Sequence, residues 1–466
     1  MYELLNNLSI QYCAFGGILV FYPFDTQAKI AVKVVFRKRK VFYGWWIVLS
    51  ASVLMFLNGG TFYYGFTTFF NPIRQAFGWT ATITSVAFTL QRLESGILGP
   101  IVGFLVDRFG PRRLMFIGWI LVGGGFLLMS RIDSLWAFYS AFLVIATGFS
   151  LSAGIATNAA IANWFNRKRA RALTVTYLGP GLGGILVPLL AFSIRQIGWR
   201  ETLAYVGIAL LVICLPLTLL VRHKPEQYGL MPDGDASPSS KAPAGTPSNP
   251  SSHQGEMGNG FTAREALSTR AFWLLAAVNF FQQTGQSSVM VHIVPYLESV
   301  NIPTTTAALA VTGMTFASLI GRLVFGLTGD FANKRYLLSI TLFLQTIGLF
   351  IFSLAGADKV WLIVAFLLTF GPGYGGAIPV RPALIADYFG MKNYGAIFGL
   401  MSVFGMVGGL ASPTLAGWIF DATGSYQTAW RLFAVVTIPS IPLMLMATQP
   451  KFKAQKPVPS PTGTGF

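Results

Sequence analysis

The sequence predicts an all-α membrane protein with twelve transmembrane helices in two pseudo-symmetric bundles of six. Three observations lead to this fold. Apolar runs of roughly 20 residues, long enough to cross a bilayer, recur along the chain. Only 11% of the 466 residues are charged, whereas a soluble domain carries roughly a quarter. So few charged residues cannot cover the surface of a water-soluble globule of this size. Landmarks of the first half also return in the second half at nearly constant spacing.

The apolar runs define the positions of the spans. Tryptophans such as Trp79, Trp199 and Trp361 mark span ends, as in the aromatic belt of a membrane interface. The predicted spans cover residues 43–71, 79–106, 112–131, 134–164, 168–195, 200–221, 270–298, 304–330, 335–355, 359–388, 392–420 and 427–448.

The basic residues predict the orientation. Of the 33 Lys and Arg residues, 24 fall in segments on one side of the predicted membrane, six on the other side and three within spans. Because cytoplasmic loops carry the excess of Lys and Arg, we expect a multi-pass protein of the inner (plasma) membrane with both termini in the cytoplasm. The net charge of +17 is spread over short loops rather than over one soluble domain, which argues against a nucleic-acid partner. We expect a monomer in the lipid bilayer.

The chain divides at stretches of low hydropathy. Gly234–Ser252 is rich in Pro, Ser and Gly and is expected to be disordered. The run Ser9–Phe24 is apolar but short for a span, and it is interpreted as an interfacial segment, part of a misassigned start, or a thirteenth helix. The expected organisation is an N-terminal extension over 1–40 (cytoplasmic or a misassigned start), bundles over 41–221 and 270–450, a cytoplasmic linker over 222–269, and a cytoplasmic tail over 451–466.

The two halves repeat each other. The offsets between matching landmarks are 223, 224 and 225 residues, and so little drift indicates an internal repeat, the usual construction of secondary transporters. The matching pairs are Gly103–Asp107 with Gly326–Asp330, Trp164-Phe165 with Tyr388-Phe389, and Pro188 with Pro413.

One loop carries a family resemblance. Gly103–Arg113 reads Gly-Phe-Leu-Val-Asp-Arg-Phe-Gly-Pro-Arg-Arg and resembles the signature loop between the second and third helices of the major facilitator superfamily. A weaker copy, Gly326–Arg335, keeps the Gly, the Asp and the basic pair, with Phe331 at the place of Arg108. The resemblance implies a gating role for these loops, with Asp107, Arg108, Arg112, Arg113, Asp330 and Arg335 as the gating residues.

The position of Asp107 suits a gate. It lies at the predicted cytoplasmic end of its helix, where its carboxylate is expected to face the positive N-terminus of a helix from the other half. Such a contact exists only when the cytoplasmic side is closed, so it biases one of two conformations, as alternating access requires. A simpler interpretation makes Arg108, Arg112 and Arg113 plain positive-inside anchors.

A narrower resemblance covers the chain in outline. Trp164–Leu173 and the Gly-rich span after it look like the helix 4–5 connection of monocarboxylate transporters and oxalate–formate antiporters, and the entry Gly44–Val48 is similar as well. The resemblance implies a secondary transporter that moves a small organic anion, of the monocarboxylate or dicarboxylate class, by proton symport or anion exchange.

Arg322 is the first candidate for substrate binding. It lies eight residues before Asp330, roughly 12 Å from the end of its helix, and the resemblance implies that an arginine here holds the substrate carboxylate. A structural contact with another helix is the alternative. Animal members of the group have an aspartate where this chain has Ser318 and a lysine where it has Tyr64, so proton symport does not carry over directly. Tyr64 is a second candidate for the substrate site.

Three further ionisable residues fall at membrane depth, where charges are costly and functional. Arg92 and Arg381 are candidates for substrate binding. Glu94, the only acid placed deep in a span, is the candidate for proton coupling, with a fixed ion pair as the alternative. Because residues two positions apart on a helix point to different sides, we expect Arg92 and Glu94 each to have a partner on another helix.

Other polar and glycine-rich segments have more than one interpretation. Gln282, Gln283 and Gln286 are expected to line a polar cavity or to bond between helices. The stretch Gly371–Gly376 resembles a phosphate loop only superficially, and helix packing or bending is the better interpretation.

Other functions are less well supported. Gly179–Gly184 fits the core of the signature of drug–proton antiporters, but Val175 replaces a glycine of that pattern. That antiporter remains the alternative function. A membrane-embedded sensor or scaffold would not need the duplicated gate. Two cysteines and three scattered histidines provide neither a metal site nor a catalytic set, so we expect no cofactor, no metal and no enzyme activity.

Overall fold

The computed structural model describes residues 11–15, 18–22, 42–234 and 260–450. The chain separates into two units, residues 1–41 and 42–466. In the first unit, β1 (Gln11–Phe15) and β2 (Ile18–Tyr22) form an antiparallel pair with Cys13 opposite Val20. Two strands therefore occupy the apolar run in which an interfacial segment or a thirteenth helix is among the expectations. The tail 451–466 and most of the predicted linker lie outside the described residues.

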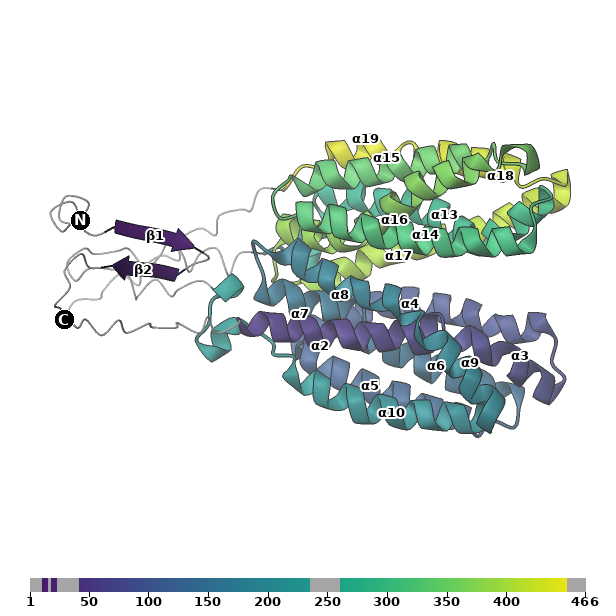
Figure 1. Ribbon diagram of the computed structural model, residues 1–466, viewed down its shortest axis with the longest axis horizontal. Helices are drawn as coiled ribbons and strands as arrows, with labels where there is room; N and C mark the ends of the chain where they lie inside the picture. Colours follow the sequence, from purple (N-terminus) through teal and green to yellow (C-terminus); the bar gives the residue numbers. More distant parts are fainter. Residues whose placement is uncertain (1–10, 16–17, 23–41, 235–259, 451–466) are drawn as a thin grey trace, which may run out of the picture. The chain divides into compact units, whose positions relative to one another are not determined.

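The first half of the helical unit contains six spans, three of them interrupted. Figure 1 shows them as the purple to teal bundle. They are α2 (Tyr43–Asn58) continued by the π-helical turn η1 (Gly59–Tyr63) and α3 (Phe66–Phe77); α4 (Ala81–Phe109); α5 (Pro111–Met129); α6 (Leu135–Ser152) with α7 (Ile155–Trp164); α8 (Arg169–Gly183) with α9 (Leu186–Ile197); and α10 (Trp199–Leu220).

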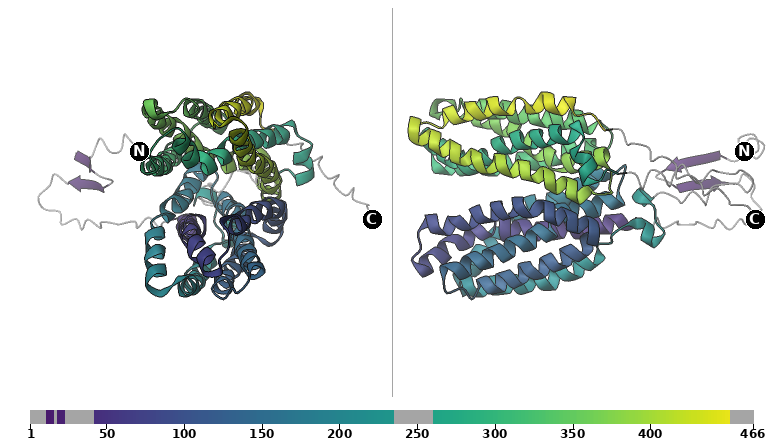
Figure 2. Two further views of the ribbon diagram at one scale, coloured as in Figure 1. Left: turned by 90° about the vertical axis from the view of Figure 1, so that its right-hand side faces the viewer. Right: turned by 180° about the vertical axis from the view of Figure 1, so that it is seen from behind.

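The second half repeats this plan in the green to yellow bundle of Figure 1, which Figure 2 shows from the end and from behind. Its spans are α13 (Arg270–Ser299), α14 (Thr304–Thr328), α15 (Lys334–Phe352), α16 (Trp361–Phe389), α17 (Tyr394–Thr423), and α18 (Gln427–Thr437) with α19 (Ser440–Met446). Short helices lie between the spans: η2 (Pro225–Tyr228), η3 (Pro232–Gly234), α12 (Ala263–Leu267) and η5 (Ala357–Lys359).

The described helices confirm the predicted twelve spans. Ten are long and apolar enough to cross a membrane by length and composition alone. The other two, α4 and α13, have 29 and 30 residues but carry the polar groups predicted to be functional, including Glu94 and Gln286, and these lower their mean hydropathy. Large apolar side chains such as Val212 and Leu368, each 67% exposed, lie on the flanks, as expected of a surface facing lipid.

Breaks in the spans have local causes. Between α6 and α7, Gly154 has φ +55°, a conformation that only glycine adopts readily. Between α4 and α5, Gly110 has φ +82°, which lets Pro111 begin the next helix at once. The sequence predicted a connection at Gly110, between the spans 79–106 and 112–131, but did not reveal the break at Gly154 inside the span 134–164.

Glycines allow helices of the same half to approach closely. α8 packs along α2 and η1, where a Cβ on Gly183 would lie 2.5 Å from the Gly60 nitrogen and 2.8 Å from the Phe56 oxygen. In the second half, a Cβ on Gly373 would meet the Thr341 oxygen at 2.7 Å. Gly371–Gly376 lies within the helix α16, so this stretch packs helices, as predicted. Small residues at such crossings are the usual means of helix association in membranes.

The crossing of α8 with η1 gives the first prediction. Gly183→Val places side-chain atoms against backbone that cannot move away. We therefore expect the free energy of unfolding to fall by about 2 kcal/mol or more, and the purified protein to have a lower Tm. The matched control is Gly184→Val, because a Cβ there has no neighbour within 4 Å and should leave Tm nearly unchanged. Equal Tm values for the two variants would contradict this packing.

Candidate functional site

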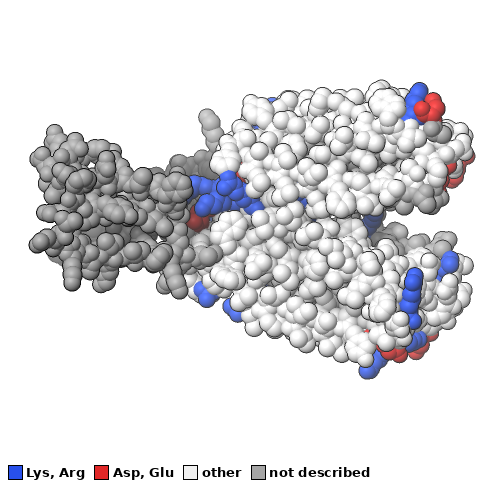
Figure 3. Space-filling model, viewed as in Figure 1, with Lys and Arg blue, Asp and Glu red and all other residues white. Residues whose placement is uncertain are grey.

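The two halves meet at one end of the helical unit. The connections around residues 110, 165–168, 329–333 and 390–393 lie there, and we call it the basic end because Lys and Arg cluster between the halves there (Figure 3). In the same view the halves separate toward the opposite end, where a notch opens between them. The interface is built by α4 along α17 and by α8 along α14.

Asp107 joins the first half to the second. Its two carboxylate oxygens accept hydrogen bonds from the backbone N–H groups of Gly395 (2.9 Å) and Ala396 (2.8 Å), in the first turn of α17. The carboxylate thus caps the N-terminus of a helix from the other half, where the helix dipole favours a negative charge, as the sequence predicted. Gly103 makes this contact possible, since a Cβ there would lie 2.9 Å from the Ala396 Cα.

Asp330 forms the same contact in the reverse direction. Its carboxylate accepts from the backbone N–H groups of Ala170 (2.8 Å) and Arg171 (3.4 Å), in the first turn of α8. The Arg171 side chain adds an ion pair to Asp330 at 3.2 Å and stacks over Phe331, 4.3 Å from the ring centre. The repeat therefore produces two equivalent caps, one from each half.

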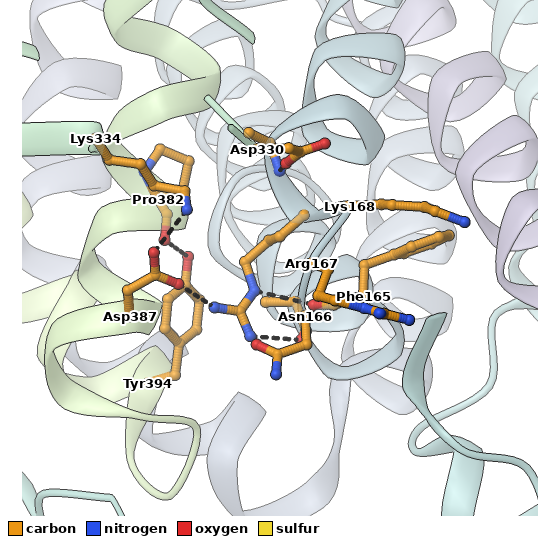
Figure 4. A network of polar contacts seen from close by, with 12 residues as sticks. Phe165, Asn166, Arg167, Lys168, Asp330, Lys334, Pro382, Asp387 and Tyr394 are labelled. Carbon is orange, nitrogen blue, oxygen red and sulfur yellow. Dashed lines mark hydrogen bonds and ion pairs between the residues drawn. The ribbon is translucent and has the colours of Figure 1, made fainter. Parts of the chain in front are cut away.

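A third contact across the halves has no equivalent in the repeat. The buried Arg169 side chain, which also donates to the Phe165 carbonyl, forms an ion pair with Asp387 at 2.8 Å. Asp387 also pairs with Lys334 at 2.7 Å, and Figure 4 shows these two side chains next to each other. The offset of 224 residues places Asn163 and Asn393 at the symmetry-related positions, so only one side of the interface carries this ionic contact.

The other predicted gating residues do not cross the interface among the described residues. Arg108 is exposed and lies over Phe109 of its own helix. Arg335 donates to the Tyr336 hydroxyl beside it. No ion pair involving Arg112 or Arg113 occurs in the described ranges. Of the six residues, the two aspartates make the contacts between halves.

The start of the predicted linker is part of this end. Asp233 is buried with φ +61°, and its carboxylate accepts from three consecutive backbone N–H groups, those of Asn166, Arg167 and Lys168. Nearby, the Arg222 guanidinium lies over Tyr43, and burial together with Lys224 lowers the pKa of His223. Sequence composition gave no sign that residues 222–234 pack on the first half.

A cavity of about 250 Å³ lies between the halves, deeper than these contacts. Tyr177 lines it from the first half, and residues of α13, α16 and α17 line it from the second. The lining residues are Tyr177, Gln283, Gln286, Tyr374, Ala377, Ile378, Arg381, Pro382 and Phe398. Of the three predicted glutamines, Gln283 and Gln286 line this cavity, and Gln286 also bonds between helices, since it donates to Gln345 of α15 at 2.8 Å.

Arg381 lines the cavity directly. Its guanidinium donates to the Asn279 side-chain oxygen at 2.7 Å and to that of Gln282, both on α13. Asn279 is itself fixed by a 2.9 Å bond from its amide nitrogen to the Met401 carbonyl. Neutral amides therefore orient the arginine and leave its charge uncompensated.

Arg322 lies beside the cavity and is only 5% exposed. It donates to the Tyr177 carbonyl at 2.7 Å across the interface, and its buried Nε has no partner. Tyr64 lies at the end of the π-helical turn and is not among the residues that line this cavity. Of the four predicted substrate residues, the structure thus places Arg381 at the cavity and Arg322 beside it, in contact with Tyr177.

Arg92 and Glu94 lie elsewhere. Arg92 is exposed, and no ion pair involves it among the described residues. Glu94 accepts hydrogen bonds from Ser95 (3.1 Å) and from Ser150 of α6 (3.2 Å), while its other oxygen is buried without a partner. A partner on another helix was predicted for both residues. Glu94 has such a partner, the Ser150 hydroxyl rather than a cation. The described residues provide no such partner for Arg92.

Sequence reasoning missed Asp387, Asn279 and Tyr177. The first is an acid near the end of a span, and the second is an amide three residues before Gln282 on the same span, so each gave a weak signal. Within the described ranges, no group of three His, Cys, Asp or Glu residues is placed to hold a metal ion.

Comparison with known proteins decides the family. The model of the Major Facilitator Superfamily matches residues 48–281 and 272–464. The chain belongs to this superfamily. It is therefore a multi-pass membrane transporter and not an enzyme.

Relatives of this superfamily member are transporters as well. The oxalate:formate antiporter of Oxalobacter formigenes is 26% identical over 410 residues, which cover 84% of this chain and 90% of the antiporter. Monocarboxylate transporter 12 of Rattus norvegicus is 27% identical over 421 residues, covering 84% of this chain and 83% of that protein.

Solved structures share the fold. A proton:xylose symporter superimposes with a TM-score of 0.69 at 14% identity, covering 87% of this chain and 96% of the symporter. The human organic anion transporter MFSD10 gives a TM-score of 0.65 at 12% identity, covering 86% and 99% of the two chains. At such low identity the likeness concerns the fold.

The two aspartate caps predict how the basic end opens. Thr174 of α8 is fully buried against Gly326 of α14, so a cysteine there reports separation of the halves. In a chain whose own two cysteines are replaced, Asp107→Asn or Asp330→Asn should make Thr174→Cys react several times faster with a maleimide, because an amide lacks the charge that favours the helix N-terminus.

Thr218→Cys is the matched control, since Thr218 is equally buried but lies within the first half, on α10. Its labelling rate should not change. An unaltered rate at Thr174→Cys in both aspartate variants would show that the caps do not hold the halves together.

Proposed function

We propose that this transporter moves a small organic anion across the inner membrane by alternating access, by proton symport or anion exchange. One observation carries the proposal. Arg381 lines the cavity between the halves, Arg322 lies next to it, and neither is ion-paired to an acid among the described residues. A cavity with uncompensated positive charge attracts anions and repels cations.

Arg322 is the proposed carboxylate ligand. A guanidinium remains charged at any physiological pH, and its planar fork matches a carboxylate through two parallel hydrogen bonds. The hydrogen bond from Arg322 to the Tyr177 carbonyl uses only part of its donor capacity, and its Nε is buried without a partner. A bound carboxylate would satisfy that donor.

The orientation and state follow from the basic end. We infer that this end faces the cytoplasm, in accordance with the positive-inside rule, and that both chain termini lie there. The contacts of Asp107, Asp330 and Asp387 then close the cytoplasmic side, and the notch in Figure 3 opens outward. In the opposite state of the cycle these contacts are broken.

Glu94 is the proposed proton site if transport is coupled to protons. Its carboxyl group is held by hydroxyls, with no cation paired to it among the described residues. Partial burial without a counter-ion favours the neutral form of a carboxyl group. Protonation of Glu94 then accompanies one of the two conformations.

The alternative, a drug–proton antiporter, has less support. The glycines of Gly179–Gly184 have packing roles: Gly183 meets η1, and Gly181 faces Arg322. The names of two relatives, an oxalate:formate antiporter and a monocarboxylate transporter, also favour an organic acid. Uptake of radiolabelled carboxylates into proteoliposomes, with and without a pH gradient, tests the proposal. It fails if no carboxylate is transported while a cationic drug is.

Arg322 provides a direct prediction. Arg322→Ala should abolish carboxylate uptake, and Arg322→Lys should restore little of it because an ammonium lacks the bidentate fork. The control is Arg431→Ala, which alters an exposed arginine on α18 and should transport normally. Uptake by a folded Arg322→Ala variant at the wild-type rate would refute the assignment.

Glu94 provides a second prediction. Glu94→Gln keeps an oxygen that accepts from Ser95 and Ser150 and resembles the protonated form. It should therefore abolish accumulation driven by a pH gradient but allow exchange of substrate across the membrane. The control is Glu201→Gln, at the exposed start of α10. If Glu94→Gln accumulates substrate normally, coupling resides elsewhere or is absent.

A further inference from the structure

Three residues at the cavity lie at one depth. Tyr177 is eight residues from the start of α8 at Arg169, Arg381 is eight residues from the end of α16 at Phe389, and Arg322 is eight residues before Asp330. At 1.5 Å per residue each lies roughly 12 Å from the basic end. Arg322 donates to the Tyr177 carbonyl, and Tyr177 and Arg381 line the same cavity. Tyr177 thus connects the two arginines at one side of this cavity.

The positive charge of this space is not neutralised by the described residues. The ion pairs of the described chain involve Asp330 and Asp387, both at the basic end. Glu94 is bound to Ser95 and Ser150 and does not line the cavity. Two permanent cations at membrane depth without counter-ions are costly, so the site favours a ligand that brings two negative charges.

Both arginines also have hydrogen-bonding capacity to spare. A guanidinium has five N–H donors. Arg381 donates to two neutral amides that fix its direction, and Arg322 has a buried Nε with no partner. The amides of Asn279 and Gln282 therefore act as positioning groups that hold one cation against the cavity without reducing its charge.

We propose that the substrate is a short dicarboxylate, with one carboxylate bound by Arg322 and the other by Arg381. This inference rests on the proposed function and narrows its substrate class. The cavity, at about 250 Å³, is smaller than the roughly 300–1,000 Å³ typical of drug-sized ligands, which sets a limit on chain length. Arg381, which binds the second carboxylate, is the residue that makes the site prefer a dicarboxylate to a monocarboxylate.

The test compares acids of equal length that differ by one carboxylate. Binding of succinate and butyrate, and of glutarate and valerate, is measured on the purified full-length protein by ligand-dependent shifts in Tm, and inhibition of uptake is measured in proteoliposomes. Removing one charged, hydrogen-bonding group from a ligand weakens its affinity by roughly ten- to a hundred-fold. We therefore expect each dicarboxylate to bind more tightly than its matched monocarboxylate by that factor.

Variants of Arg381 assign the preference. Arg381→Gln should lose the preference for dicarboxylates but still bind monocarboxylates through Arg322, while the charge-conserving Arg381→Lys should keep part of the preference. A dicarboxylate preference that persists in Arg381→Gln would overturn the role of Arg381. If Arg381→Gln does not fold, the role of Arg381 is tested by Arg381→Lys, whose preference for dicarboxylates should be smaller than that of the wild-type protein.

The outcomes separate this inference from the proposed function. Wild-type protein that binds butyrate as tightly as succinate overturns the dicarboxylate inference and leaves the organic-anion transporter standing. Wild-type protein that binds and transports none of the four acids, nor any other carboxylate of the uptake panel, overturns both.

Discussion

The arrangement of the two halves depends on a carboxylate placed against the N-terminus of a helix from the other half. Asp107 caps α17 and Asp330 caps α8 through bonds of 2.8–3.4 Å. A helix N-terminus attracts negative charge only at short range, so each cap is lost when the halves separate. The glycines before the aspartates let the helices approach closely enough. Two such caps, related by the internal repeat, fix the closed basic end and therefore the shape of the cavity behind it.

Much of this could be predicted from the sequence because it depends on local patterns. Span positions follow from hydropathy, the repeat from constant offsets, and the contact of Asp107 from its place at a helix end. The ion pair of Arg169 with Asp387 could not be predicted, since it joins residues 218 apart and breaks the symmetry of the repeat. Three further features depend on backbone geometry that composition does not encode. They are the break at Gly154, the strands at 11–22, and the three backbone N–H groups that donate to Asp233.

The two repeated halves contribute different groups to the cavity. Arg381 of α16 lines it and Arg322 of α14 lies beside it, both in the second half, whereas the first half provides Tyr177 as the contact for Arg322. Arg381 is held by amides of α13, and Asn279 in turn is tied to α17. Movement of the second half against the first would separate Arg322 from Tyr177 and would also break both aspartate caps. Occupation of the cavity and closure of the basic end are thereby linked through the same interface.

The most direct test of this account is the distance between the halves at the basic end. Ile117 of α5 and Ile340 of α15 are exposed and are related by the repeat offset of 223 residues. Spin labels at Ile117→Cys and Ile340→Cys, in a chain without its own cysteines, can be measured by pulsed electron resonance. Because α5 and α15 lie on the outer sides of their halves, the account predicts one narrow distance distribution, which shifts to longer distances and broadens when Asp107→Asn and Asp330→Asn are combined. An unchanged distribution in that double variant would contradict it.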